Sequence, residues 1–174
     1  MRRTTWPLRE LGICINYNSY GAAVADLHVA PDDLYRRLRH YSNPLDFIAQ
    51  DPAFRCLREG YASDMAQARG TPPTLAAARH RLYILPADAW ARRASGVLAN
   101  ELTHQSPACA HALLTRLPAG GFLVSVRAPL TGPQGADRLC REFATGGGRT
   151  GAAGINHLPD ADYDRFVERF IAAF

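Results

Sequence analysis

The spacing of apolar residues divides the chain into a helical first part and a mixed second part. Before residue 71, apolar positions recur at helical spacing in three stretches that each open with a proline, a residue favoured in the first turn of a helix. The segment 12–21, "GICINYNSYG", differs because its apolar residues alternate, which indicates an extended chain followed by a turn. The three prolines are Pro31, Pro44 and Pro52.

From residue 79 onward, short apolar runs typical of strands alternate with helical patterns. This order predicts an α/β (α+β) fold, with a mixed β-sheet of about four to five strands flanked by helices and preceded by a helical linker segment. The expected elements are strand 81–85, a helix capped by Asp88, strands 109–117 and 121–129 joined by a hairpin turn, helix 135–143, strand 152–159 and a last helix capped by Asp160.

A break in the pattern separates the two parts. The stretch 69–78, "RGTPPTLAAA", contains Gly70, Pro72 and Pro73 and interrupts any periodicity, which is typical of a linker or hinge. We therefore predict a helical segment with its linker over residues 1–78 and a substrate-binding domain over residues 79–174.

Composition and charge indicate which compartment and which partners to expect. No apolar run reaches the roughly 18 residues that a membrane span requires, and no signal-peptide run follows the basic start, so we expect a cytoplasmic protein without a membrane partner. Four scattered cysteines without a CxxC pair are typical of free thiols in a reducing compartment. The net charge of +4 suggests a polyanionic partner such as nucleic acid. However, all 20 basic residues are arginine, which a GC-rich coding bias alone also explains.

Three consecutive glycines near the end of the chain need a physical reason, because glycine is costly to order. Gly146, Gly147 and Gly148 permit positive φ angles that turn backbone N–H groups toward one point, and such a nest binds anions. Arg149, which follows directly, can grip a phosphate or carboxylate through its planar guanidinium. A flexible surface loop is the alternative explanation of this run.

The preceding strand favours the anion-binding interpretation. Ser125 and Arg127 are separated by one residue, so they share a face of the strand about 6.6 Å apart, at roughly 3.3 Å per residue. Successive phosphates of a nucleic-acid strand have a comparable spacing. The pair is therefore predicted to form, with the glycine run, a sequence-independent phosphate site. A solvated edge arginine is the alternative for Arg127.

Together these motifs resemble the associated C-terminal domain of the DHH phosphoesterases, the RecJ-like group. The segments 125–127, 146–148 and 152–154 match the family's Ser-x-Arg, GGG and AAG patterns, and "SGVLANEL" (95–102) is similar to the family's helix after the first strand. The resemblance covers roughly residues 79–174. Residues 8–38 resemble the connection that leaves the catalytic domain in one bacterial branch of the family.

Two departures from the family pattern bear on function. Arg149 stands where the family has histidine, which favours substrate clamping over proton transfer because arginine stays charged. The sequence also contains no Asp-His-His motif and no N-terminal strand with paired aspartates, the groups that hold two metal ions in the family. Asp26, His28, Asp32 and Asp33 do not replace them, because the last two are explained as charges at a helix N-terminus and two ligands do not make a two-metal site.

The resemblance implies a chain that binds substrate and has no catalytic or metal-binding residue of its own. The expected ligand is a short single-stranded oligonucleotide or a nucleotide phosphoester. A full-length family member would hydrolyse it with manganese or magnesium in the catalytic half, which this chain largely lacks. The candidate binding residues are Ser125, Arg127, Gly146, Gly147, Gly148 and Arg149, with Asn100 and Asn156 as weaker candidates for sugar or base contacts.

Other interpretations stay open. The chain is alternatively a stand-alone, non-catalytic nucleic-acid or nucleotide-binding module, or a degenerate remnant without a ligand. Whether it is a fragment, a shortened reading frame or the partner of a separately encoded catalytic half is also open, as is a homodimer. The sequence does not distinguish RNA, DNA, a cyclic dinucleotide or a small phosphoester as the ligand.

Overall fold

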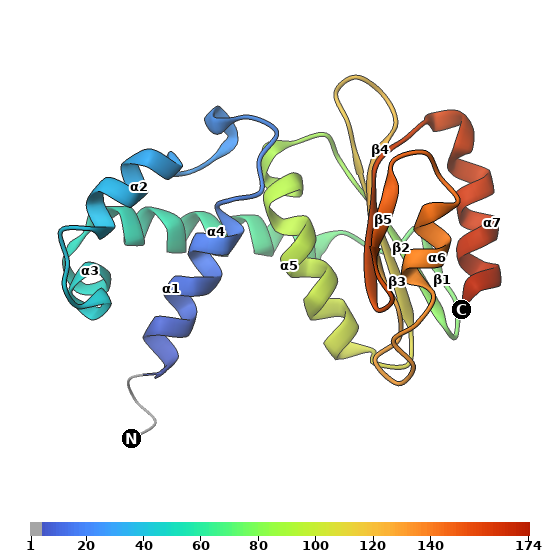
Figure 1. Ribbon diagram of the computed structural model, residues 1–174, viewed down its shortest axis with the longest axis horizontal. Helices are drawn as coiled ribbons and strands as arrows, with labels where there is room; N and C mark the ends of the chain where they lie inside the picture. Colours follow the sequence, from blue (N-terminus) through green and yellow to red (C-terminus); the bar gives the residue numbers. More distant parts are fainter. Residues whose placement is uncertain (1–4) are drawn as a thin grey trace.

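The computed structural model describes residues 5–174 and shows one mixed β-sheet with helices on both faces (Figure 1). The helices are α1 (Thr5–Tyr17), α2 (Pro31–Leu38), α3 (Pro44–Gln50), α4 (Pro52–Gly70), α5 (Ala89–Gln105), α6 (Ala136–Arg141) and α7 (Tyr163–Ala173), with 3-10 turns η1 (Val24–Asp26) and η2 (Asp160–Asp162). The strands are β1 (Leu75–Ala76), β2 (His80–Leu85), β3 (Ala110–Arg116), β4 (Phe122–Arg127), β5 (Gly146–Arg149) and β6 (Ala152–Leu158).

The sheet has six strands in the order β1-β2-β3-β4-β6-β5. Strands β2 and β3 are parallel, joined by the crossover helix α5, and every other neighbouring pair is antiparallel. The α/β fold class is confirmed, with slightly more strands than expected. The sequence pattern does not reveal β1 because it has two residues, or β5 because three of its four residues have no side chain.

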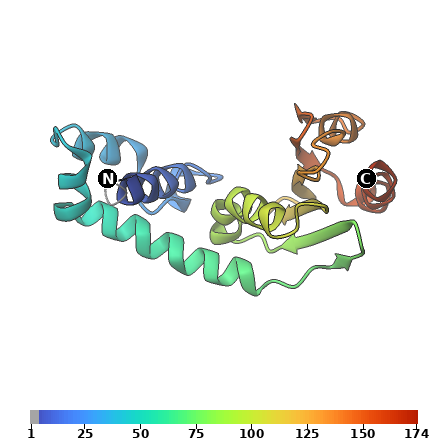
Figure 2. The same cartoon turned by 90° about the horizontal axis from the view of Figure 1, so that it is seen from below.

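The two faces of the sheet are covered by different helices (Figures 1 and 2). Helices α6 and α7 pack on one face, where Phe166 and Phe170 of α7 are fully buried in the main apolar core. Helix α5 packs on the other face over β3 and β4, in a second core that includes Leu98 and Leu113. Burial of large apolar side chains on both faces stabilises the sheet, at about 25 cal/mol per Å² of apolar surface.

The N-terminal segment departs from its predicted conformation. Residues 12–17 belong to helix α1, so the prediction of an extended chain there is wrong. Leu11, Cys14 and Tyr17 recur every three residues and are all buried, which is helical spacing. The alternation of Ile13 and Ile15 misled the prediction, because both isoleucines lie at the edge of the helix face and are half-buried.

Two helices begin as expected without the predicted caps. Asp88 occupies the N-cap position of α5, but its side chain makes no capping bond and accepts a hydrogen bond from Trp90 Nε1 at 3.1 Å. Asp160 begins η2, and its Oδ2 accepts a hydrogen bond from the backbone N–H of Gly121 at 2.8 Å. Asp160 therefore holds the β3–β4 hairpin turn, and its predicted role as a cap of α7 is wrong.

Helix α4 connects the first helices to the sheet domain, running from α1–α3 to the side of α5 (Figure 2). Met65 and Ala68 of α4 lie in the α5 core, and Arg69 donates two hydrogen bonds of 2.8 Å to Glu101 of α5. The end of α4 thus packs as part of the sheet domain, and the boundary at residues 78 and 79 stays a prediction. Across residues 5–174, none of the helices is long and apolar enough to cross a membrane.

Candidate phosphate-binding face

The strand register places most of the predicted binding residues on one face of the sheet. Ser125 of β4, Gly154 of β6 and Gly147 of β5 lie in one row across the three strands. Arg127, Ala152 and Arg149 lie in the next row. Since directly paired residues of antiparallel strands point to the same side, Ser125, Arg127 and Arg149 share a face with the backbone of Gly147.

Arg127 is the central side chain of this face, and it is held by two neighbouring side chains and by the carbonyl oxygen of Val126, which accepts from Nη1 at 3.2 Å. Its Nε donates to Asn100 Oδ1 of α5 at 3.0 Å, and its Nη1 donates to Ser125 Oγ at 2.8 Å. Ser125 therefore orients Arg127, and the contact of these two side chains with phosphates stays a prediction. Nη2 of Arg127 makes no hydrogen bond within the described chain.

The face carries positive charge without compensation. Burial lowers the pKa of Arg127, and the neighbouring charge of Arg149 lowers it further, while Tyr20 acts in the opposite direction. Within residues 5–174, neither Arg127 nor Arg149 forms an ion pair with a carboxylate. A half-buried guanidinium beside a second cation favours an anionic partner.

The three glycines form an edge strand, so the prediction of a turned nest of N–H groups is wrong. Only Gly148 has a positive φ, at 143°, and the positive φ expected at Gly147 is absent. A Cβ on Gly146 would lie 1.7 Å from the carbonyl oxygen of Cys140, and one on Gly148 would lie 2.5 Å from Ala153 Cα. A Cβ on Gly147 would meet nothing within 4 Å. Two glycines are thus required by packing, and the middle one leaves the sheet backbone open on the Arg127 face.

The two asparagines predicted as weaker candidates have different positions. Asn100 belongs to the site because its amide accepts the hydrogen bond from Arg127. Asn156 is exposed on β6, four residues along the strand from Ala152, the partner of Arg127 in the sheet register. Its backbone N–H bonds to Thr145, and no hydrogen bond within the described chain joins its side chain to the Arg127 group.

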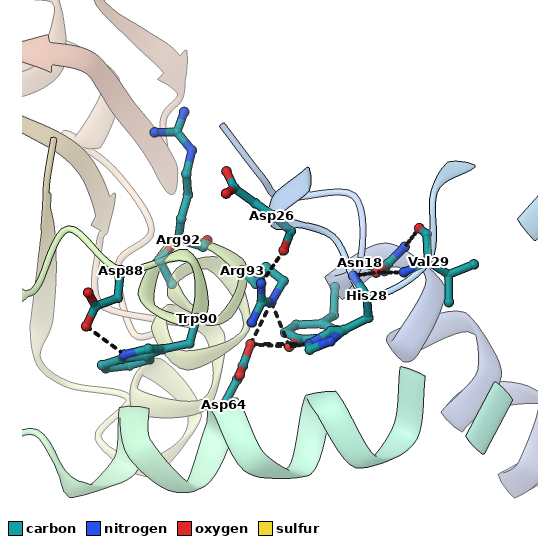
Figure 3. A network of polar contacts seen from close by, with 11 residues as sticks. Asn18, Asp26, His28, Val29, Asp64, Asp88, Trp90, Arg92 and Arg93 are labelled. Atoms are coloured by element: carbon teal, nitrogen blue, oxygen red, sulfur yellow. Dashed lines mark hydrogen bonds and ion pairs between the residues drawn. The ribbon is translucent and has the colours of Figure 1, made fainter. Parts of the chain in front are cut away.

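A buried polar network holds the first helices against α5 (Figure 3). Arg93 of α5 donates from Nε to Asp64 Oδ2 at 2.7 Å and to the Tyr17 hydroxyl at 3.1 Å, and its Nη1 bonds to the carbonyl of Asp26. The Tyr17 hydroxyl also bonds to Asp64, and it lies 2.9 Å from His28 Nε2. Burial raises the pKa of Tyr17 and lowers the pKa of His28, so both side chains are held in their neutral forms.

This network positions the turn after α1 next to the candidate site and was missed in the sequence. Tyr20 lies in that turn, is exposed, and is close enough to influence the pKa of Arg127. The signal available in the sequence was an aromatic residue within a turn of Asn, Ser and Gly, which the alternating pattern before it obscured. Arg93, a buried arginine in the middle of a helix, had no signal of its own.

The four residues weighed as metal ligands are used in other ways. Asp26 accepts hydrogen bonds from the N–H groups of Ala22 and Ala23, and His28 belongs to the buried network. Asp32 and Asp33 lie in the first turn of α2 and pair with arginines one turn later. In the part of the chain that the structure describes, no group of three or more His, Cys, Asp or Glu side chains could hold a metal ion.

No protein-family model matches this sequence, and neither does any curated protein. Among solved structures, RecJ of Thermus thermophilus in complex with Mn²⁺ is similar over 92% of this chain and 23% of the RecJ chain, at 18% identity and a TM-score of 0.60. The same protein in complex with Mg²⁺ is similar over 70% of this chain and 19% of its own, at 19% identity and a TM-score of 0.54. The pGpG-specific phosphodiesterase PggH of Vibrio cholerae is similar over 80% of this chain and 47% of its own, at 12% identity and a TM-score of 0.50.

These solved structures are members of the DHH family, and the chain has the fold of part of them. The fold implied by the resemblance in sequence is therefore confirmed. The chain spans less than half the length of each of these structures. The RecJ structures hold Mn²⁺ or Mg²⁺, for which the described residues of this chain do not form a site.

Proposed function

We propose that this chain is the phosphate-binding part of a DHH-family phosphoesterase. It binds a short single-stranded oligonucleotide or a nucleotide phosphoester through Arg127 and Arg149, with the open backbone at Gly147 between their strands. Ser125 and Asn100 orient Arg127, and Asn156, four residues along β6 from Ala152, is kept as a weaker candidate for a sugar or base contact. Hydrolysis then depends on a catalytic half that is not contained in these 174 residues.

The observation that carries this proposal is the pair of arginines without a carboxylate partner in the described chain, both on one face of the sheet. Other arginines of the described chain do form ion pairs, for example Arg69 with Glu101 and Arg169 with Glu142. Arg127 is instead oriented by three neutral groups, which are the side chains of Asn100 and Ser125 and the carbonyl of Val126, and these keep its full charge available. A phosphate that bridges Arg127 and Arg149 would form charge-assisted hydrogen bonds with both guanidinium groups.

The alternative function is a stand-alone nucleic-acid or nucleotide-binding module, which would use the same face without any catalytic partner. The fold shared with a phosphodiesterase and with RecJ favours the first function. The coding sequence immediately upstream distinguishes the two, because an in-frame Asp-His-His motif with paired aspartates would supply the catalytic half.

Replacement of the arginines tests the proposed contact. Arg127→Ala and Arg149→Ala should each weaken binding of a 5′-phosphorylated oligonucleotide about tenfold or more, as expected for the loss of a charge-assisted hydrogen bond. Each should also reduce the slope of log K against log salt by about 1, since one fewer phosphate is neutralised. Isothermal titration at two salt concentrations measures both effects.

Arg138→Ala provides the matched control. Arg138 is an exposed arginine on α6, and that helix covers the opposite face of the sheet. Its replacement removes the same charge and should leave affinity and salt slope close to those of the wild type. If all three variants bind with the affinity and salt slope of the wild type, the face that carries Arg127 and Arg149 is not the phosphate site and the proposed function is wrong.

A further inference from the structure

A hollow of about 520 Å³ lies beside Arg127, between helices α1, α4 and α5. It is connected to the candidate phosphate site through Asn100, which lines the hollow and also accepts the hydrogen bond from Arg127. Its volume falls within the range of about 300–1,000 Å³ that is typical of small-ligand sites. The proposed phosphate contact makes no use of this hollow.

The walls of the hollow suit a flat, partly apolar ligand. Ile13 of α1 and Val97 of α5 contribute half-buried aliphatic side chains, and Tyr61 of α4 contributes an aromatic ring. The Tyr61 ring is fixed by an edge-to-face contact with Tyr17, with ring centroids 5.3 Å apart. A rigid aromatic ring with aliphatic neighbours is a surface on which a nucleobase can stack.

The polar groups of the hollow include a donor and an acceptor one helical turn apart. Asn100 Oδ1 is occupied by Arg127, so its Nδ2 remains as a donor. His104 Nδ1 lies 2.7 Å from the carbonyl oxygen of Asn100 and must donate to it, so Nε2 of the neutral ring is an acceptor. The side chain of Asn16 forms no hydrogen bond within the described chain and adds a second donor and acceptor.

Glu101, an acidic side chain that lines the hollow, does not repel an electron-rich ligand. The carboxylate of Glu101 is bound by Arg69 at 2.8 Å through each of its oxygens, and Gln105 also donates to it at 3.2 Å. Its charge is therefore neutralised by a partner on α4. Besides the exposed Arg9 of α1, the hollow presents apolar walls and amide and imidazole groups, a combination that recognises the edge and face of a heterocyclic base.

We propose that this hollow binds the nucleobase of the nucleotide whose phosphate contacts Arg127, with Asn100 linking the two contacts. The inference rests on the proposed function, and it adds a preference for base-bearing ligands over bare phosphate esters. Stacking on Tyr61 requires no particular base, while Asn100, His104 and Asn16 read the base edge. The site thus discriminates nucleotides from other phosphoesters.

The experiment compares two probes in isothermal titrations with the full chain. One probe is a 5′-phosphorylated tetradeoxyadenylate, and the other is a 5′-phosphorylated abasic tetramer with the same phosphates. The wild type should bind the adenine probe about tenfold or more tightly than the abasic probe, as base stacking at protein sites typically gives. Arg127→Ala should weaken both probes.

Two variants address the hollow itself. Asn16→Ala removes a side chain of α1 that lines the hollow and should weaken only the adenine probe. Val97→Phe fills the hollow and should reduce the adenine probe to the affinity of the abasic probe, whose binding stays unchanged. Circular dichroism verifies folding of each variant, and Arg138→Ala serves as the control that changes neither affinity.

The outcomes separate the two proposals. Equal affinity of the wild type for both probes would overturn the nucleobase site and leave the phosphate site standing. Loss of binding to both probes in Asn16→Ala, with its fold intact, would assign the hollow to the phosphate contact and also overturn the inference. If the wild type binds neither probe, the proposed function fails and the inference fails with it.

Discussion

The two faces of the β4–β6–β5 part of the sheet differ in what covers them. On one face, Val124, Val126 and Ile155 are buried under α6 and α7. On the other face, Ser125 and Arg127 are half-buried and Arg149 is exposed, because α5 packs over β3 and β4 rather than over β5. The same strands thus supply an apolar core to one side and a pair of cations to the other.

Because successive residues of a strand point to opposite faces, one strand can contribute to stability through one face and to binding through the other. Residues that point toward α7 contribute apolar burial, so their loss should unfold the domain. On β4, β5 and β6, residues that point away from α7 bury less apolar surface, so their loss should mainly change ligand affinity. Variants on each face test whether the two faces are independent in this way.

The largest effect is expected on the covered face. Phe166 is fully buried and stacks on Phe170, with ring centroids 6.1 Å apart and an interplanar angle of 7°. Phe166→Ala should lower the free energy of unfolding by about 3–5 kcal/mol, the usual cost of truncating a core aromatic. Urea unfolding followed by circular dichroism measures this change. Arg149→Ala on the other face removes an exposed side chain and should change stability by less than about 0.5 kcal/mol, and equal losses would show that the faces are not independent.

A change in pH tests the buried part of the sheet face that carries Arg127. His111 of β3 pairs with Arg127 in the sheet register and is fully buried, and burial with the charge of Arg81 lowers its pKa to about 4. The unfolded chain binds this proton near pH 6.5, whereas the folded chain does not, so stability is present above pH 6.5 and is lost as the pH falls toward 4. The loss should be on the order of 3 kcal/mol.

Urea unfolding at pH values from about 7 down to about 4 measures this dependence, because that range spans both pKa values of the histidine. His111→Gln removes the titrating group, and its free energy of unfolding should therefore fall less steeply over this range than that of the wild type. Parallel curves for the two proteins would show that His111 is protonated as easily in the folded state as in the unfolded chain.

The smallest expected effects concern two neighbouring glycines, which should respond with opposite signs. Gly146→Ala places a methyl group against the backbone of Cys140 and should destabilise the fold by about 1–3 kcal/mol. Gly147→Ala meets open space and should stabilise the fold by about 0.4–1 kcal/mol, because alanine restricts the unfolded chain. Thermal unfolding of both variants provides the comparison. Destabilisation by Gly147→Ala would mean that the site backbone at β5 is tightly packed after all.

Much of the sheet domain could be predicted from the sequence, because its signals are local. The alternation in 121–129, the turn glycines before it and the apolar stripe of the last helix correspond to β4, the hairpin and α7. The placement of Ser125 and Arg127 on one face followed from the same alternation. Their pairing with Arg149 across β6 could not be predicted, because it depends on which strands are neighbours.

The remaining features depend on contacts between distant segments. The contact between Asn100 and Arg127 joins residues that are 27 apart, and the Arg93–Asp64 pair joins residues that are 29 apart. Neither pair leaves a periodic trace in the sequence. The conformation of the glycine run was also out of reach, because glycine permits both a nest and a strand, and only the proximity of α6 and β6 selects the strand.

The glycine strand has a further consequence for the behaviour of the protein at high concentration. β5 is one edge of the sheet and β1 is the other, with four and two residues respectively. Exposed edges invite pairing with another chain, and short length and a charged side chain are two features that discourage it. A strand of another molecule would find almost no side chains to pack against at an edge of three glycines, and Arg149 would repel the same arginine of a second copy. The sheet should therefore resist growth from one molecule to the next.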